Sequence, residues 1–313
     1  MYYNTNGILS ESPISDKFWF QKSFDKYIYK HGDISVELDF ICVALQHLLA
    51  EKIFGSRQAY FSLLLSSHTG ITDGGIDSDI KISKEEFEKM VQASEDNETF
   101  NKLLYYFDCR NLISTLQNSI TETQNLVGQF FELLNENNFL LTSKPIDPEG
   151  LQFASGFIII NIVSIMNYLF VNLYSQLDFV TKIIYEFENL EKDFSKYPKI
   201  KSAKILYGNS RHLAIKKEGT LFENSKLTNL IMTLRNEIVH NASLDNLPKV
   251  YQLFRDGILI DKYILLPDTL EGKLRTYQNR RRFFYNENKL NEILPDLVIE
   301  FWQRLKQTLK NIK

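Results

Sequence analysis

Apolar residues recur three and four positions apart along most of this chain, which is the spacing of a helix that buries one face. This periodicity predicts helices over residues 36–53, 58–65, 99–134, 153–194, 221–240 and 289–310. The range 153–194 predicts one very long helix or two, and Gly128 is a candidate interruption of the helix over 99–134. Ser83 and Glu86 have the spacing of a capping box, which predicts a short helix from there to about Gln92.

A polar segment over residues 66–82 collects Gly, Asp, Ser and Thr, and this composition predicts an exposed loop. Its acidic residues Asp73, Asp77 and Asp79 invite comparison with a calcium-binding loop. They lack the ligand spacing, central glycine and final glutamate of an EF-hand, so a solvated turn is the favoured interpretation.

A second break, over residues 144–150, places two prolines and a glycine within a short stretch. Such residues end helices, so we expect a domain boundary there, with a mostly helical N-terminal region over 1–150 and a second helical domain over 151–313. Within the second domain, Asp256-Gly257 separates two β-prone runs and predicts a β-hairpin near 250–266. The predicted fold class is therefore all-α, with a small β-hairpin insertion.

Net charge, cysteines and histidines limit the kinds of binding site that this chain can form. The formal net charge is −3 and the calculated pI is near 6.0, so any nucleic-acid surface must be a local patch or be assembled by oligomerisation. Cys42 and Cys109 lack the spacing of a zinc site or a disulfide framework, which favours reduced, buried thiols. His31, His47, His68 and His212 have no local metal-ligating partners, so we expect no metal and no cofactor.

Residues 157–173 are nearly long and apolar enough to span a bilayer. Asn161, Asn167 and Asn172 would each bring an amide into hydrocarbon, which favours a buried bundle helix over a membrane span. The N-terminus lacks the basic start and apolar core of a signal peptide, so we expect a cytoplasmic protein that does not bind membranes.

The chemistry-bearing residues lie near the end of the helix predicted over 221–240. When residues 227–240 are projected on a helix, Arg235 lies between two apolar flanks, and Asn236 and His240 lie on an adjacent arc. RNA cleavage through its own 2′-hydroxyl needs proton transfer near neutral pH and stabilisation of a phosphorane-like transition state. Imidazole can perform the first task and guanidinium the second, without a metal. Asn236 precedes His240 by four residues, a spacing that allows it to orient the ring or the scissile phosphate.

Residues 234–241, Leu-Arg-Asn-Glu-Ile-Val-His-Asn, resemble the motif of the HEPN superfamily, in which an arginine and a polar residue are followed by a histidine near a helix end. The likeness covers about residues 157–244 and leaves the N-terminal 150 residues and the hairpin unexplained. Residues 174–182 are similar to the partner helix of that family and contain Asp178. By this resemblance Asp178 faces Arg235 and His240 and orients one of them.

The resemblance implies a HEPN-like helical bundle that forms a homodimer, with two copies of the motif facing each other across a cleft that cuts RNA. The implied activity is that of a metal-independent endoribonuclease, with a role as a toxin or phage-defence effector and an antitoxin protein as a possible partner. His240 would then be the general acid and base, Arg235 would stabilise the phosphate and Asn236 would position it.

Other interpretations of the same residues stay open. Arg235 can pair with Asp178 or Glu237 in a structural role, and His240 can interact with the last carbonyls of its helix. Some HEPN-like domains are non-catalytic, so the alternative function is a module that binds a nucleotide or a partner protein through the same groove.

A second candidate site is the segment 273–285, which interleaves basic and aromatic residues. Such a run can hold phosphates and stack bases. The alternative is a solvated face whose aromatic side chains pack inward. The candidate RNA-binding residues are Lys273, Arg275, Arg280, Arg281 and Arg282.

Overall fold

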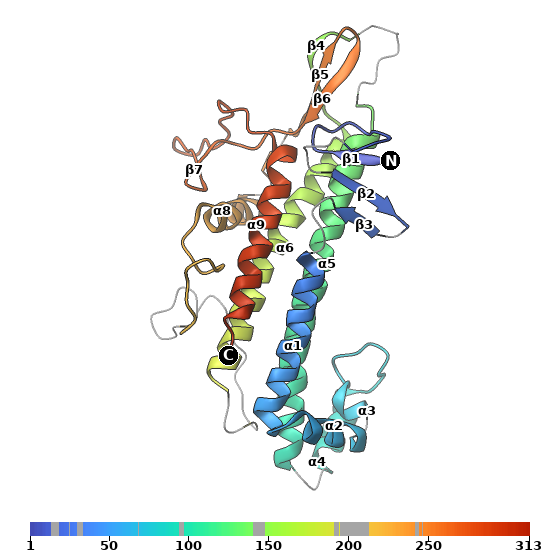
Figure 1. The fold of residues 1–313 in the computed structure, drawn as a ribbon, viewed down its shortest axis with the longest axis vertical. Coiled ribbons are helices and arrows are strands. Elements are labelled where there is room, and N and C mark those ends of the chain that lie inside the picture. Colours follow the sequence, from blue (N-terminus) through green and yellow to red (C-terminus); the bar gives the residue numbers. More distant parts are fainter. Residues whose placement is uncertain are drawn as a thin grey trace. The chain divides into compact units, whose positions relative to one another are not determined.

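The structure of the protein, a computed structural model, describes residues 1–13, 19–24, 26–29, 34–67, 69–93, 97–139, 148–190, 194, 213–241, 244–245 and 247–313. Its helices are α1 (Ile34–Phe54), α2 (Arg57–Ser66), α3 (Thr69–Thr72), α4 (Lys84–Gln92), α5 (Asn97–Glu136), α6 (Phe157–Glu188), α8 (Lys226–Asn241) and α9 (Leu290–Lys310) (Figure 1). Its strands are β1 (Tyr2–Asn4), β2 (Trp19–Ser23), β3 (Lys26–Tyr29), β4 (Gly150–Ala154), β5 (Val250–Arg255), β6 (Ile258–Tyr263), β7 (Thr269–Leu270) and β8 (Lys273–Leu274).

The helices follow the predicted periodicity closely. α1, α2, α5 and α9 begin and end within a few residues of the predicted bounds, and Ser83 forms both hydrogen bonds of the predicted capping box at the start of α4. α8 starts later than predicted, because Ser225 accepts a hydrogen bond from the Thr228 N–H at 3.2 Å and caps the helix there. The predicted loop over 66–82 contains the single helical turn α3.

α5 continues through Gly128, so the candidate interruption is wrong. A β-carbon at Gly128 would lie 2.2 Å from the ring of Tyr27. The glycine therefore lets the tyrosine ring of β3 pack directly on the helix backbone, and the hydrogen bonds of α5 continue past it.

The described residues are mostly helical but also form three small sheets, so the prediction of a single hairpin was incomplete. The hairpin itself is confirmed: β5 pairs antiparallel with β6, and Asp256 and Gly257 have φ values of 51° and 73°, as a type I′ turn requires. β4 adds a third strand to β5, and it occupies part of the range predicted to be helical from residue 153. β1–β2–β3 and β7–β8 form the other two sheets.

The chain divides into two compact units. The first contains residues 1–35, 119–175 and 217–307, and the second contains residues 36–118, 176–216 and 308–313. Both units combine segments from before and after residue 150, where the sequence predicts a boundary. In the second unit Cys42 and Cys109 are free and buried, as predicted, and burial raises the pKa of the Cys42 thiol to about 12.

α6 is long and apolar enough to cross a membrane by length and composition, and it is the one such helix in the part of the chain that is described. In its most apolar window 44% of the residues are buried inside the protein. The same properties are found in core helices of water-soluble proteins, so this helix is weak evidence for a membrane span.

A buried lysine joins the sheet β4–β5–β6 to the end of α5. Lys262 on β6 is 2% exposed, and its ammonium donates to the carbonyl oxygens of Asn135 and Asn137 at 3.1 and 2.8 Å. These carbonyls lie at the C-terminal end of α5, where backbone acceptors lack helical partners and favour a cation. Burial nevertheless lowers the pKa of Lys262 to about 8, because the charged form loses hydration.

We expect Lys262→Met to change the pH dependence of stability. The unfolded lysine has the higher pKa and binds a proton more readily, so the wild-type free energy of unfolding should rise with pH between about 8 and 10.5. Relative to the methionine variant, it should gain roughly 1–2 kcal/mol between about pH 7.5 and 9.5. Urea unfolding at several pH values measures this, with Lys273→Met as the exposed control. Parallel curves for the wild type and Lys262→Met would contradict the assignment.

Candidate functional site

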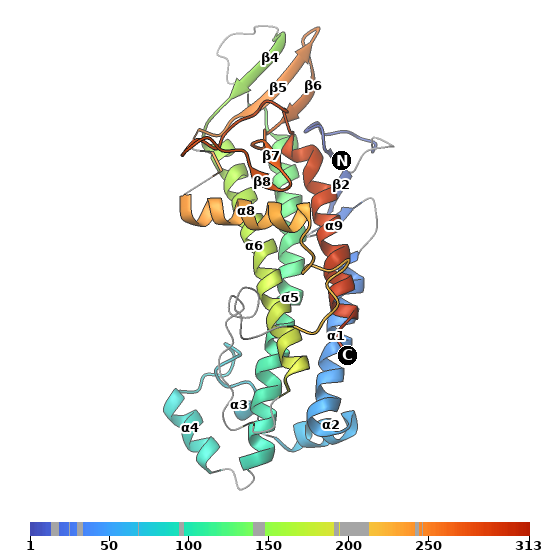
Figure 2. The ribbon, with the colours of Figure 1, turned by 90° about the vertical axis from the view of Figure 1, so that its left-hand side faces the viewer.

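The predicted motif lies on α8, which runs across α6 rather than along it (Figure 2). One face of α8 is buried and consists of Leu227, Leu230, Ile231, Leu234 and Glu237. The motif residues lie outside this face: Arg235 is half-buried, and Asn236 and His240 are exposed. The motif is therefore accessible from solvent.

Two neighbours orient the Arg235 guanidinium. Its carbon lies 4.8 Å from the ring centroid of Tyr174 on α6, a cation–π contact. Its Nη1 donates to the Asn236 Oδ1 at 3.0 Å. The planar guanidinium is thus held by an aromatic face and an amide oxygen, and neither neutralises its charge. An anion can therefore approach it from the solvent side.

His240 lies four residues after Asn236, in the last turn of α8. Its imidazole is exposed and forms no hydrogen bond or ion pair with the described residues. A cation at this position interacts favourably with the final carbonyls of the helix. The ring is accessible to a second molecule.

Asp178 is half-buried on α6 and belongs to the second unit. Its predicted position opposite Arg235 and His240 stays a prediction. Within the first unit, Arg235 contacts Tyr174 of α6. Tyr174 lies in the segment 174–182 that the sequence analysis compared with the partner helix, but only Asp178 was predicted to be a site residue there. Its position one helical turn before Asp178 could have indicated that Tyr174 faces the same side of α6.

The structure joins α8 to the basic segment through an ion pair that the sequence did not predict. Glu237 is 7% exposed, and its carboxylate accepts hydrogen bonds from Arg281 Nε at 2.9 Å and Arg281 Nη1 at 3.1 Å. Asn241 Nδ2 also donates to Glu237 Oε2 at 3.1 Å. A bidentate ion pair of this kind fixes the orientation of the guanidinium as well as its distance from the carboxylate. Arg281 therefore holds the basic segment against α8.

An open hollow of about 450 Å³ lies over this ion pair. It is lined by Glu237 and Asn241 of α8 and by residues 279–283. Arg282 lines it too, and its Nε donates to the carbonyl oxygen of Leu244 at 2.9 Å. The hollow thus lies between the end of the motif helix and a cluster of guanidinium groups, and its lining does not include Arg235, Asn236 or His240.

Gly272 and Asp268 hold the basic segment in place. Gly272, with φ +78°, turns between β7 and β8, and a β-carbon there would lie 2.3 Å from the Lys226 carbonyl oxygen. Only glycine allows this approach to the first turn of α8. The buried Asp268 carboxylate accepts the backbone N–H groups of Tyr285 and Asn286 at 2.9 and 3.1 Å.

The other basic side chains of the segment and three of its four aromatic rings are exposed, whereas Phe284 is half-buried. Lys273, Arg275 and Arg280 are exposed. The aromatic residues are 65% exposed at Tyr277, 41% at Phe283 and 89% at Tyr285. These three rings do not pack inward, whereas Phe284 does, so the alternative of a solvated face with inward-packed aromatic rings describes one ring of the four.

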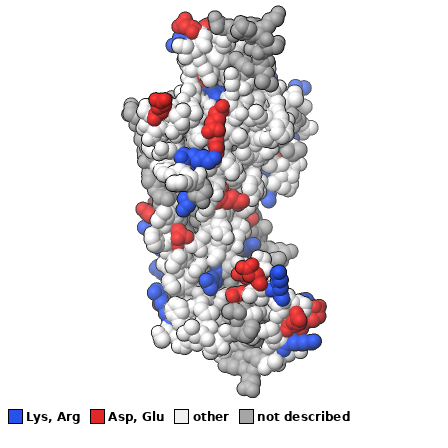
Figure 3. Space-filling model, turned by 90° about the vertical axis from the view of Figure 1, so that its right-hand side faces the viewer, with Lys and Arg blue, Asp and Glu red and all other residues white. Residues whose placement is uncertain are grey.

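The basic segment is a local feature of the surface. On the face drawn in Figure 3, lysine and arginine are interspersed with aspartate and glutamate, and the net charge of the chain is −3. No group of three or more His, Cys, Asp or Glu able to hold a metal occurs among the described residues. Of the other histidines, His47 is half-buried on α1, and His31, His68 and His212 lie outside the described residues.

Comparisons with known proteins give no relative. No family model matches the chain, and neither a curated protein nor a solved structure is similar to it.

We expect Arg281→Met to destabilise the first unit, because it leaves the buried Glu237 carboxylate without its cation. With Arg281 about one-third exposed, the loss of stability should be about 1–3 kcal/mol. The same substitution at the exposed neighbour Arg280 should change stability by less than about 0.5 kcal/mol. Urea unfolding of the two variants gives the comparison, and equal stability would show that the ion pair does not anchor the segment.

Proposed function

We propose that this protein is an RNA-directed, metal-independent endoribonuclease of HEPN type. The observation that carries the proposal is an ion pair that connects the motif helix to the basic segment. Glu237 and Arg281 fasten the helix of Arg235 and His240 to a segment rich in exposed cations and aromatic rings. RNA would be held by that segment, with phosphates on the guanidinium groups and unstacked bases on the rings.

The proposed reaction uses the 2′-hydroxyl of the substrate itself. Its oxygen attacks the adjacent phosphorus, the bond to the 5′-oxygen breaks, and a 2′,3′-cyclic phosphate and a 5′-hydroxyl are formed. His240 removes the proton from the nucleophile or delivers one to the leaving oxygen. Arg235 stabilises the charge on the phosphorane-like transition state, and Asn236 holds its guanidinium.

A single motif supplies one imidazole, whereas the reaction needs a base and an acid. We propose that two copies of the chain associate so that their exposed His240 side chains face one RNA strand. The exposure of Asn236 and His240 supports this arrangement, because a motif buried under its own chain could not take part. A toxin or phage-defence role, restrained by an antitoxin protein, belongs to the same proposal.

Cleavage of total RNA and tRNA by the purified protein in excess EDTA tests the activity. We expect cutting that EDTA does not inhibit and products that end in 2′,3′-cyclic phosphate. His240→Ala and Arg235→Ala should each lower the rate by about 10²-fold or more, since each removes a group that acts in the transition state. His47→Ala, on α1, is the matched histidine control and should cut at the wild-type rate.

The second candidate function is a non-catalytic module that binds a nucleotide or a partner protein on the same surface. The single motif imidazole of each chain is the observation that favours it. Equal background cleavage by the wild type, His240→Ala and Arg235→Ala, with folding and oligomeric state unchanged, would support this function and contradict the nuclease.

The exposed cations of the basic segment should determine how RNA binding responds to salt. Each phosphate of a single strand that a cation neutralises contributes about 0.7 to the slope of log affinity against log salt. Lys273→Ala, Arg275→Ala and Arg280→Ala, combined, should therefore reduce the slope by about 2. Fluorescence anisotropy of a labelled RNA at several salt concentrations measures it. Replacement of the exposed Lys84 and Lys89 on α4 is the control, and an unchanged slope in the triple variant would contradict the RNA surface.

A further inference from the structure

The sheet β4–β5–β6 leaves one of its two edges open. Its strand order places β4 at one edge and β6 at the other, and Figure 2 shows β4 on the outer side of β5. At the edge of β6, the backbone N–H of Lys262 donates to the carbonyl oxygen of Asn6 at 2.8 Å. Among the described residues, no backbone group pairs with the outer edge of β4. This edge can therefore accept another strand.

β4 lacks the features by which proteins protect an open edge. Natural edge strands often carry charged side chains, a proline or a bulge, each of which hinders pairing with another chain. β4 has the sequence Gly-Leu-Gln-Phe-Ala, and it pairs with β5 in regular register over its whole length. The strand thus contains no charge, no proline and no bulge. An unprotected edge of this kind is suited to pairing with a second strand.

The outer face of β4 and the start of α6 expose large apolar side chains. Leu151 is 56% exposed and Phe153 is 60% exposed. The chain then enters α6, where Phe157 is 77% and Ile160 is 52% exposed. Monomeric soluble proteins rarely expose large contiguous apolar patches, and such patches mark interaction sites. Burial of these side chains against another molecule would remove apolar surface from water, which favours association.

The open edge argues against a lipid surface as the partner. Hydrocarbon cannot form hydrogen bonds with the unpaired N–H and C=O groups of β4, so their burial in lipid is unfavourable. A strand of another polypeptide satisfies these groups and covers the apolar side chains at the same time. The partner that fits both properties of the edge is a polypeptide in extended conformation.

We infer that β4 pairs antiparallel with β4 of a second copy of this chain, about a two-fold axis at Gln152. This register uses the whole strand and places Leu151 opposite the partner subunit's Phe153, and Phe153 opposite the partner subunit's Leu151. The strand is therefore complementary to itself. The three strands of each copy would then form one continuous sheet.

Charges at the ends of β4 are compatible with this register. Glu149 directly precedes β4 and is exposed. Lys249 directly precedes β5, and its Nζ lies 4.6 Å from the centroid of the Phe153 ring. Because Val250 pairs with Ala154, Lys249 lies beside the C-terminal end of β4. In the antiparallel pairing that end meets the partner subunit's Glu149, so opposite charges come to the same end of the interface.

The pairing of β4 does not depend on the nuclease activity. A second chain is nevertheless what the proposed reaction needs for its second imidazole. The use of the β4 dimer for RNA cleavage therefore rests on the proposed function, whereas the dimer itself does not.

Sedimentation velocity of the full-length protein over a range of concentrations tests the inference, and we expect the wild type to form dimers. Leu151→Lys combined with Phe153→Lys places like charges opposite each other and should weaken dimerisation about ten-fold or more. Leu151→Glu combined with Phe153→Glu should do the same. An equimolar mixture of the two variants should restore dimers, because each lysine then lies opposite a glutamate. Restoration would also show that both variants are folded.

Leu65→Lys combined with Leu270→Lys is the matched control. It replaces two apolar residues that are 88% and 63% exposed and lie on α2 and β7, so dimerisation should not change. A wild type that is monomeric at every concentration, or dimers that neither β4 variant weakens, would overturn the inference. Dimers that are lost in each β4 variant and restored by mixing, without EDTA-resistant cleavage, would support the pairing and contradict the nuclease. EDTA-resistant cleavage by a monomeric wild type would do the reverse.

Discussion

The ion pair between Glu237 and Arg281 is the interaction on which the candidate site depends. A carboxylate that is 7% exposed on the buried face of α8 requires a cation, and the cation comes from a segment 44 residues later in the chain. Because the guanidinium uses two donors, it fixes the direction of the segment as well as its distance. The close approach of Gly272 to α8 and the backbone hydrogen bonds to Asp268 hold the segment on either side of this pair.

The basic residues of the segment 273–285 fall into two groups, one that holds the segment in place and one that is exposed to solvent. Arg281 has its charge satisfied by Glu237, and Arg282 donates to a backbone carbonyl, so both define the shape of the segment. Lys273, Arg275 and Arg280 remain exposed together with three aromatic rings. In a chain with a slight negative charge, such a surface attracts an anion mainly at short range, since the chain as a whole supplies no positive field and salt screens exposed charges. Recognition would then depend on direct contacts with phosphates and bases.

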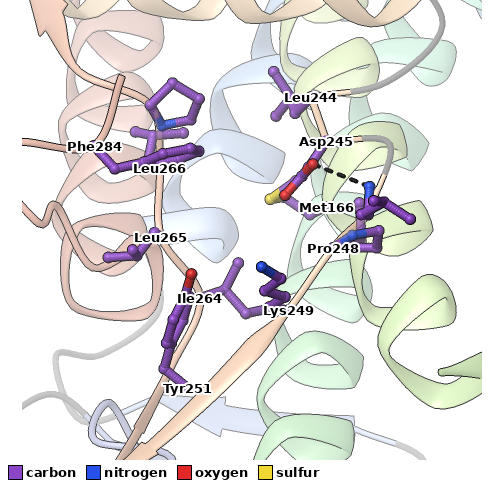
Figure 4. A pocket seen from close by; sticks show the side chains of 13 residues that line it. Met166, Leu244, Asp245, Pro248, Lys249, Tyr251, Ile264, Leu265, Leu266 and Phe284 are labelled. Carbon is purple, nitrogen blue, oxygen red and sulfur yellow. Dashed lines mark hydrogen bonds between the residues drawn. The ribbon is translucent and has the colours of Figure 1, made fainter. Parts of the chain in front are cut away.

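The first unit also contains a buried lysine, Lys262, whose charge needs a stabilising partner. Among the described residues, Lys262 pairs with no carboxylate and instead donates to carbonyls at the end of α5, so a helix terminus replaces an ionic partner. The interaction connects the sheet β4–β5–β6 to the long helix. This sheet carries Tyr251 and leads into residues 264–267, so it also supports two walls of a pocket of about 270 Å³ in the first unit (Figure 4).

Local patterns in the sequence determined the elements of this protein. Helical periodicity, the capping box at Ser83 and the Asp256-Gly257 turn act over a few residues, so they could be identified from neighbouring positions alone. The helix that carries the motif residues also followed from its periodicity. Tertiary structure decided the rest, because its contacts join distant positions. Strand β4 pairs with β5, which lies far along the chain, and the need for glycine at position 128 comes from the Tyr27 ring that packs against it. The roles of Glu237, Arg281 and Tyr174 depend on side chains that meet only after α8 has packed against its neighbours.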